Sequence, residues 1–205
     1  MNSSRKFCEN LKILAVDDGK LPGKHQKSRG ETILVGVKME KTLINDVKLR
    51  TIKVDGLDAT EKILEIIDET RPIELIILGG ISYGGFNLID AVKVWEKSKI
   101  PIIIVSKEKP DNNKILAALK KHFKDWERRW NIIRKVVEKA NGIHEVYIKE
   151  KENPIYIENI GLNVKEAISI LRKLTVWGRT PEPIRIAHII ARGISTAYLK
   201  LKNYQ

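Results

Sequence analysis

Three aspartates stand where predicted β-strands end, and carboxylates in such places can hold a divalent cation. Asp17 and Asp18 follow the apolar run Leu11–Val16, and Asp55 follows the alternating run Val47–Val54. Mg²⁺ often needs only one or two carboxylates, because waters and substrate phosphates complete its shell. Such an ion can activate water for phosphodiester hydrolysis. A glycine follows Asp18 and another follows Asp55. Because Asp-Gly is a common hairpin signal, plain turns are the alternative interpretation of these aspartates.

A glycine-rich stretch lies between a predicted strand and a predicted helix. Its sequence is GGISYGGFN, from Gly79 to Asn87, and free N–H groups at a helix start can hold phosphate. The stretch lacks the Lys-Ser/Thr ending of a nucleotide-binding P-loop and the GxGxxG spacing of a dinucleotide site. A tight turn explains it equally well, although four glycines favour a close approach of the backbone to another group.

Basic residues dominate the charge of the chain. The 205 residues carry 38 Lys and Arg against 26 Asp and Glu, a formal net charge of +12. Residues 111–140 hold 9 basic residues against 4 acidic ones. A positive balance attracts polyanions through steering and counterion release, so a polyanionic partner is predicted, and a solvated charged surface is the alternative. Lys107 follows an apolar strand, which places its ammonium group at the same sheet edge as the aspartates; a lysine that is simply solvated is the alternative.

The spacing of apolar runs and turn signals predicts an α/β fold with a mixed sheet. Strands and helices alternate through the middle of the chain, which requires parallel pairing through crossovers. Asp58 followed by Glu61 predicts a capped helix start, and the helical spacing of Trp126 and Trp130 predicts core tryptophans. Strands are expected at 11–16, 32–37, 47–54, 73–78, 100–105, 144–149 and 155–159, and helices from 58 and at 84–97, 113–123, 125–140, 164–174 and 181–199.

Other classes of protein are excluded. The longest uncharged run, Leu75 to Ile89, has 15 residues, short of the roughly 20 that a spanning helix needs, so no membrane partner is expected. The first residues lack the apolar stretch of a signal peptide. Cys8 is the only cysteine, so no internal disulfide can form, and the cytoplasm is the expected compartment.

Five motifs together carry a family resemblance. They are AVDDG at 15–19, VDGLDATE at 54–61, GGISYGGFNLID at 79–90, IPIIIVSKEKPD at 100–111 and PEPIRIAHIIARGI at 181–194. In this order, over nearly the whole chain, they resemble the endonuclease dU family (UPF0215 type), a mostly archaeal group related to endonuclease V. The resemblance implies a ribonuclease-H-like, endonuclease V-like domain over residues 1–205. It also implies metal-dependent cleavage of DNA near a deaminated base, deoxyuridine or deoxyinosine, in DNA repair.

The same resemblance implies roles for individual residues. Asp17 and Asp55 look like metal-binding catalytic acids, with Mg²⁺ or Mn²⁺ as cofactor and Asp18 as an auxiliary ligand. Lys107 is similar in place to a lysine near the scissile phosphate. DNA, or RNA, is the expected partner, and the residues expected to contact it are Gly80, Tyr83, Gly84, Lys24, Lys27, Arg29, Arg185 and His188.

The chain departs from the family pattern at one position of this site. Where the family typically has Leu-Asp-Gly-Ile after a strand, this chain has Leu-Gly-Gly-Ile, with Gly79 in place of the acid. A glycine has no side chain to bind metal. The alternative function is therefore a nucleic-acid-binding protein of the same fold with impaired catalysis. A small-molecule phosphate-binding protein is a third possibility, which rests on the glycine stretch alone.

Overall fold

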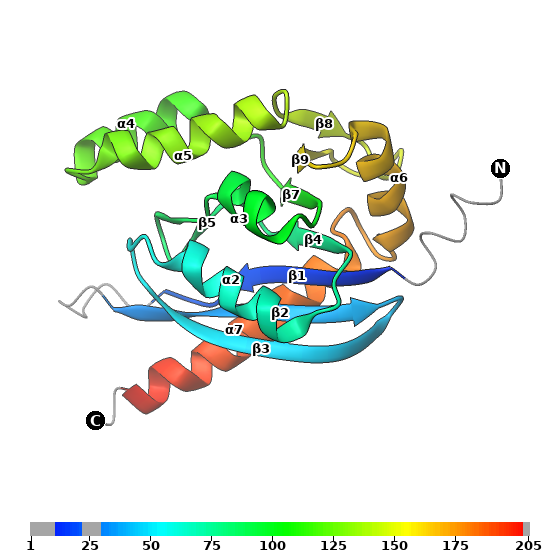
Figure 1. Ribbon diagram of the computed structural model, residues 1–205, viewed down its shortest axis with the longest axis horizontal. Coiled ribbons are helices and arrows are strands. Elements are labelled where there is room, and N and C mark those ends of the chain that lie inside the picture. The colour runs from blue at the N-terminus through cyan, green and yellow to red at the C-terminus, as the bar shows by residue number, and fades with distance from the viewer. Residues whose placement is uncertain (1–10, 22–29, 203–205) are drawn as a thin grey trace.

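The computed structural model describes residues 11–21 and 30–202, which form a seven-stranded mixed sheet flanked by helices (Figure 1). The sheet strands are β1 (Lys12–Asp18), β2 (Glu31–Glu40), β3 (Leu43–Lys53), β4 (Leu75–Leu78), β7 (Ile102–Ser106), β8 (His144–Val146) and β9 (Ile155–Ile160). The helices are α2 (Ala59–Thr70), α3 (Ala91–Ser98), α4 (Asn112–His122), α5 (Trp126–Lys139), α6 (Val164–Leu174) and α7 (Glu182–Lys202). The strand order is β3-β2-β1-β4-β7-β9-β8.

The three central strands are parallel and end at one edge of the sheet. β1 pairs with β4 and β4 pairs with β7 in parallel, whereas every other neighbouring pair is antiparallel. Parallel neighbours need crossover connections, and α2 and α3 are the helices in those connections. The expected α/β fold with a mixed sheet is confirmed, and the last residues of β1 and the residues that follow β4 and β7 lie at this edge.

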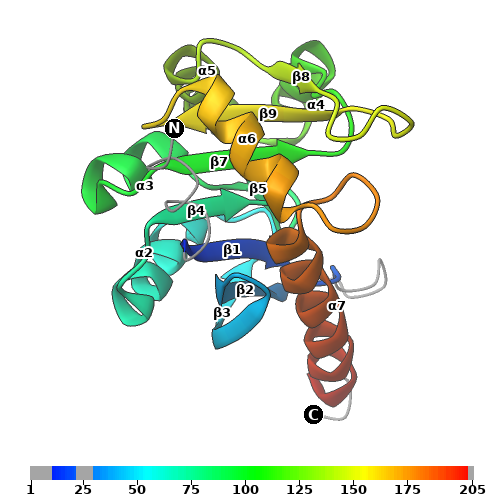
Figure 2. The same ribbon diagram turned by 90° about the vertical axis from the view of Figure 1, so that its right-hand side faces the viewer.

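Helices cover both faces of the sheet, because its central strands are apolar on both sides. Leu14 and Val16 of β1 pack with apolar residues of α2 and α3. Ile13 and Ala15, which point the other way, pack with apolar residues of α6 and α7. Figure 2 shows α2 and α3 on one side of the sheet and α6 and α7 on the other. Helix α7 is therefore held against the strand that carries Asp17 and Asp18.

The helical pair α4 and α5 builds a third apolar cluster beside the sheet. Trp126 and Trp130 are half-buried and pack against buried Leu88, Leu119 and Ile133, so the prediction of core tryptophans is confirmed for their packing but not for full burial. Within residues 11–21 and 30–202, no helix has both the length and the hydropathy needed to cross a bilayer.

The helix expected over residues 84–97 is wrong in its first half. Instead, a small antiparallel hairpin forms from β5 (Ser82–Tyr83) and β6 (Asn87–Leu88), and α3 begins only at Ala91. Gly84 and Gly85 at the hairpin tip have φ of 52° and 84°, a left-handed backbone that glycine adopts without strain and that cannot start a right-handed helix. The glycine stretch is thus a turn, and no helix start lies within it.

The predicted helix start at Asp58 is confirmed, since α2 begins at Ala59, but the predicted capping by the Asp58 side chain is wrong. Asp58 precedes α2, but its carboxylate accepts hydrogen bonds from the Lys53 amide at 3.3 Å and the Asn87 side chain at 2.5 Å and does not cap the helix. The Asn87 side-chain oxygen accepts from the Ala59 amide at 3.0 Å and supplies the cap. Of the two turns that are the alternative interpretation of the aspartates, the one at Asp17 and Asp18 is wrong, because both are paired residues of β1, whereas Asp55 does lie in a turn.

Candidate active site

Asp17 lies at the sheet edge between the last strand residues and helix α7. Its side chain is buried, with 8% of the residue exposed. One carboxylate oxygen accepts the Asp18 amide at 2.8 Å, and the other lies 2.9 Å from Nδ1 of His188 on α7. Burial raises the pKa of Asp17, whereas the Asp18 amide, His188 and the charge of Lys107 act in the opposite direction. Asp17 is a carboxylate held in place by one amide and one imidazole.

Asp18 points away from α7 and contacts the glycine turn. Its carboxylate accepts the Gly84 amide at 2.6 Å. Burial raises the pKa of Asp18 to about 6, the Gly84 hydrogen bond opposes that rise, and the neighbouring charge of Asp17 adds to it. A carboxyl with this pKa gains negative charge at neutral pH and favours a nearby cation.

Asp55 follows β3 in a strained turn conformation and faces the same glycine turn. Its φ is 58°, and its backbone amide donates to the Gly84 carbonyl at 2.8 Å. Its carboxylate accepts the Phe86 amide at 2.9 Å. A side chain at Gly85 would collide with this carboxylate, so glycine is needed there. The turn therefore joins Asp18 to Asp55 through the single residue Gly84.

Arg129 of α5 holds the backbone around Asp55 in place through its guanidinium group. The residue is 5% exposed, and its guanidinium donates to the backbone carbonyls of Asp55 at 2.9 Å, Gly56 at 3.0 Å and Phe86 at 2.6 Å. Its Nε donates to Asp125 at 3.0 Å. The rigid fork of the guanidinium matches this set of acceptors, so Arg129 ties the Asp55 turn to the glycine turn.

The position of the missing acid faces Asp17 directly. A Cβ atom at Gly79 would lie 3.2 Å from both Cγ and one carboxylate oxygen of Asp17. The side chain of an acidic residue at position 79 would therefore begin next to the carboxylate of Asp17. Among the described residues no group of three or more His, Cys, Asp or Glu side chains is close enough together to hold a metal ion.

The donor chemistry still suits a hard divalent cation. Asp17, Asp18 and Asp55 each accept a backbone amide, and a carboxylate has acceptor capacity for a further partner. Oxygen ligands of this kind select Mg²⁺ or Mn²⁺, and Mg²⁺ is commonly held by one or two carboxylates with water in the remaining positions. The site fits a cation that is bound by few protein ligands.

The residues expected to contact nucleic acid are dispersed. Tyr83 is fully buried, and its hydroxyl donates to the Gly80 carbonyl at 2.9 Å, so it supports the turn from inside. Gly84 is also buried, whereas a Cβ at Gly80 would meet open space. Arg185 on α7 pairs with Glu182. Lys24, Lys27 and Arg29 lie outside the described residues.

A cavity of about 330 Å³ opens beside the glycine turn, and Glu158 of β9 lies in its wall. Glu158 is 5% exposed, and burial raises its pKa to about 7. No described residue forms a hydrogen bond with its carboxyl group. A buried carboxyl without a partner is costly to the fold when it is ionised.

The pH dependence of folding is expected to report this cost. The pKa of Glu158 is about 7 in the folded protein against an ordinary value of 4.5. The contribution of this carboxyl group to the free energy of unfolding is therefore fully present below about pH 4.5 and is lost as the pH rises through 7. The Glu158→Gln variant is expected to be more stable than the wild type at pH 8, by about 2–3 kcal/mol, and equally stable at pH 4.5. Urea unfolding at the two pH values tests this, and an equal difference at both would contradict it.

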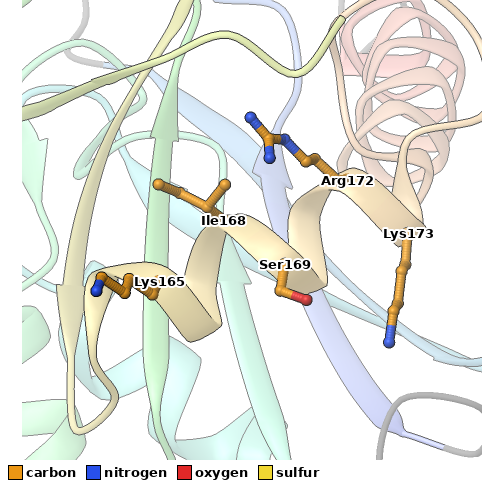
Figure 3. Close-up of a pocket in the computed structure, with 5 residues that line it drawn as sticks. All are labelled: Lys165, Ile168, Ser169, Arg172 and Lys173. Carbon is orange, nitrogen blue, oxygen red and sulfur yellow. The ribbon is translucent and has the colours of Figure 1, made fainter. Parts of the chain in front are cut away.

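A second hollow, of about 450 Å³, belongs to α6 alone (Figure 3). Its lining residues are Lys165, Ile168, Ser169, Arg172 and Lys173. No residue of the sheet edge or the glycine turn is among them, so this hollow is separate from the carboxylates. Its cations add to the positive charge on the side of the sheet that α7 covers.

Comparison with known proteins identifies the family. The model of the family described as endonuclease dU matches residues 9–195. The chain belongs to the endonuclease dU family. A "UPF0215 protein" of Thermococcus gammatolerans is 35% identical over 195 residues, which is 94% of this chain and 96% of that protein. The crystal structure of an Archaeoglobus fulgidus protein of unknown function shares 32% identity and a TM-score of 0.74, over 90% of this chain and 98% of that one.

Structures of endonuclease V share the fold of this endonuclease dU family member. Endonuclease V of Ciona intestinalis, in complex with a 24-mer DNA containing an inosine followed by a ribo-adenosine, has a TM-score of 0.58 at 14% identity. The alignment covers 96% of this chain and 88% of that one. The prediction of an endonuclease V-like, ribonuclease-H-like fold is confirmed.

Several residues of the site carry roles that the sequence did not predict. His188 was expected on a nucleic-acid-binding face, and the structure places it against Asp17. Arg129 belongs to a run of basic residues that is typical of a solvated surface, yet it is buried. The signal for its ion pair in the sequence was Asp125, an acidic residue four positions earlier. Glu158 interrupts the apolar residues of a strand, and a charged residue at such a position could have indicated a buried carboxyl group.

Proposed function

We propose that this protein is a divalent-metal-dependent endonuclease that cleaves DNA near a deaminated base. One observation carries the proposal: the pair of buried Asp17 and exposed His188, 2.9 Å apart at the edge where the parallel strands end. Family membership and the basic balance of the chain also support it. A DNA-repair role in the cytoplasm follows from the same proposal.

Each residue of the site has a chemical task in this proposal. One or two of the carboxylates Asp17, Asp18 and Asp55 would hold the cation, with water in the remaining positions. When bound, the cation would supply activation of water and stabilisation of the leaving oxygen. Since Nδ1 of His188 is engaged with Asp17, its Nε2 is left to exchange a proton with a group on the substrate side. Lys107 lies near enough for its charge to lower the pKa of Asp17, and it would neutralise a phosphate.

The direct test is cleavage of a labelled DNA strand that carries one uracil, with Mn²⁺ or Mg²⁺ present. We expect a single product, which is absent when EDTA replaces the ion or thymine replaces uracil. If the protein binds the strand with a salt-dependent affinity, falling by about 0.9 log units per neutralised phosphate for each tenfold rise in salt, but gives no product with either ion, the binding protein with impaired catalysis is correct instead.

Restoring the family acid is expected to strengthen metal binding. In the Gly79→Asp variant a second carboxylate starts beside Asp17, so repulsion should destabilise the metal-free protein. A bound cation would offset the repulsion between the two carboxylates and so stabilise the variant. We expect Mn²⁺ to raise the Tm of the variant by at least about 4 °C more than that of the wild type, which corresponds to roughly 1–2 kcal/mol of added binding energy.

Gly79→Ala is the matched control, because it adds the same Cβ without charge. Its Tm should respond to Mn²⁺ as the wild type does. A faster cleavage rate in Gly79→Asp would mean that this chain has a weakened metal site, whereas an unchanged rate and an unchanged Mn²⁺ response would show that position 79 has no part in metal binding.

A further inference from the structure

Two aromatic side chains lie exposed at the sheet edge that carries the carboxylates. Trp177, in the loop between α6 and α7, is 74% exposed, and Tyr147, directly after β8, is 52% exposed. Because β7 and β8 both run antiparallel to β9, β8 also ends at this edge. Tryptophan is highly buried on average, so a ring left this open to water next to a second exposed ring indicates a binding surface.

Arg179 holds the loop of Trp177 against this edge. Its guanidinium donates to the carbonyl of Lys107, which follows β7, at 2.8 Å and to that of Pro154 at 2.7 Å. Figure 2 shows the loop between α6 and α7, in orange, projecting on the same side as the loop between β8 and β9.

Trp177 is close enough to the carboxylates for one strand to contact both. β7 lies two strand spacings, roughly 10 Å, from β1. Trp177 precedes Arg179 by two residues, at most about 7 Å of chain. A strand at the carboxylates therefore reaches Trp177 in fewer than about ten nucleotides, at roughly 3.4 Å per phosphate.

Two exposed cations accompany the rings. Nζ of Lys149 donates to the carbonyl of Val176, the residue before Trp177, at 2.8 Å. The guanidinium of Arg172 donates to the carbonyl of Tyr147 at 3.2 Å. A carbonyl has no net charge, and no described carboxylate forms an ion pair with either cation. The aromatic-cationic patch, which consists of Tyr147, Lys149, Arg172 and Trp177, thus carries positive charge that an anionic ligand can neutralise.

This combination of groups favours unpaired nucleic acid as the ligand. Surfaces that bind single strands place cations along the phosphates and aromatic rings against the bases. In a duplex the base faces are stacked on each other and cannot reach such a ring. An apolar protein partner would bury the two cations without a counter-charge, which is costly. The Tyr147 hydroxyl donates to Glu145 at 3.1 Å, which orients its ring.

We propose that the aromatic-cationic patch binds an unpaired stretch of the substrate strand beside the carboxylates. One base stacks on Trp177, while Lys149 and Arg172 neutralise phosphates of the same stretch. This inference rests on the proposed function, since it takes the strand that is cleaved at the carboxylates as the ligand. It adds that this strand is unpaired on the side of the site where β7 and β8 end.

The test measures binding in EDTA, where no cleavage occurs. Fluorescence anisotropy compares two labelled single strands of equal length, oligothymidylate and a strand of abasic sites that has the same phosphates but no bases. We expect Trp177→Ala to bind oligothymidylate about tenfold more weakly than the wild type, the loss typical of one stacked base. Its affinity for the abasic strand should be unchanged. Trp177→Phe, which keeps a ring, should stay within about threefold of the wild type on oligothymidylate.

The two cations are tested by the salt dependence of the same binding. Lys149→Gln and Arg172→Gln should each reduce the slope of log affinity against log salt by about 0.7, the counterion release expected for one phosphate of a single strand. Because this effect needs no base, it should be the same on oligothymidylate and on the abasic strand.

Val176→Ala is the matched control, since Val176 is an exposed apolar neighbour in the same loop but has no ring. It should bind both strands as the wild type does. The inference is overturned if Trp177→Ala binds oligothymidylate as tightly as the wild type, if it loses affinity equally for the abasic strand or for a hairpin duplex, or if both glutamine variants keep the wild-type salt slope. Failure of the proposed function is distinguishable, because it would appear as a wild type that cleaves no uracil strand and still shows these binding losses in its variants.

Discussion

Replacing Asp17 by asparagine is expected to lower the rate of metal-dependent strand cleavage by about 10³-fold. Asparagine keeps the shape of the side chain and an oxygen that accepts the Asp18 amide, but it lacks the negative charge that would hold the cation and orient His188. Removal of one preorganised electrostatic group from an active site commonly costs 10²–10³-fold, and loss of a metal ligand adds to this. The measurement is a single-turnover rate on the uracil strand at saturating Mn²⁺.

The fold should survive this substitution, since a buried charge is removed and its hydrogen bond is kept. The Tm in EDTA is expected to stay within a few degrees of the wild type or to rise. Asp68→Asn serves as the control, because the Asp68 side chain is 75% exposed on α2 and should leave the rate unchanged. A variant at Asp17 that cleaves at the wild-type rate would remove Asp17 from the mechanism.

Replacing Arg129 by methionine is expected to destabilise the protein by about 3 kcal/mol. The substitution leaves the carbonyls of Asp55, Gly56 and Phe86 without their donor in a partly buried place. Breaking a fully buried charged network from one side costs roughly 3–5 kcal/mol, so the lower end of that range is expected. Because Asp125 is 40% exposed, water recovers part of that loss. Urea unfolding gives the difference in free energy.

The same substitution should reduce cleavage in the fraction that remains folded, because Asp55 and the glycine turn lose their shared support. Arg128→Met is the matched control, since Arg128 is the exposed neighbour on the same helix, and its stability should change by less than about 0.5 kcal/mol. If Arg129→Met were as stable as Arg128→Met, the three carbonyl contacts would contribute nothing to the fold.

The sequence predicted the parallel core of the sheet because its signals are local. Apolar runs such as the one before Asp17 and the alternation before Asp55 are properties of neighbouring residues. The amphipathic pattern of α6 gave its bounds, Val164–Leu174, without error. The hairpin at residues 82–88 was mistaken for a helix start because an amphipathic segment follows it, and the left-handed glycines that form it have no periodicity to detect.

The contacts that assemble the candidate site are not local, and this is why the sequence did not reveal them. Gly84 meets Asp18 across 66 residues, and Arg129 meets Asp55 across 74. No spacing rule connects such positions. The predicted strand ends and the family resemblance indicated Asp17 and Asp55 as partners in one site, but neither gave a role to Arg129 or Glu158.

The contact between Asp17 and His188 has a consequence for the order in which the protein is made. The two residues are 171 positions apart, so a ribosome must synthesise most of the chain before the imidazole can reach the carboxylate. Closure of so long a loop comes late in folding. A translation product interrupted before α7 would carry every acid of the site without its histidine, and the nascent protein would stay inactive toward DNA until that helix docked on β1.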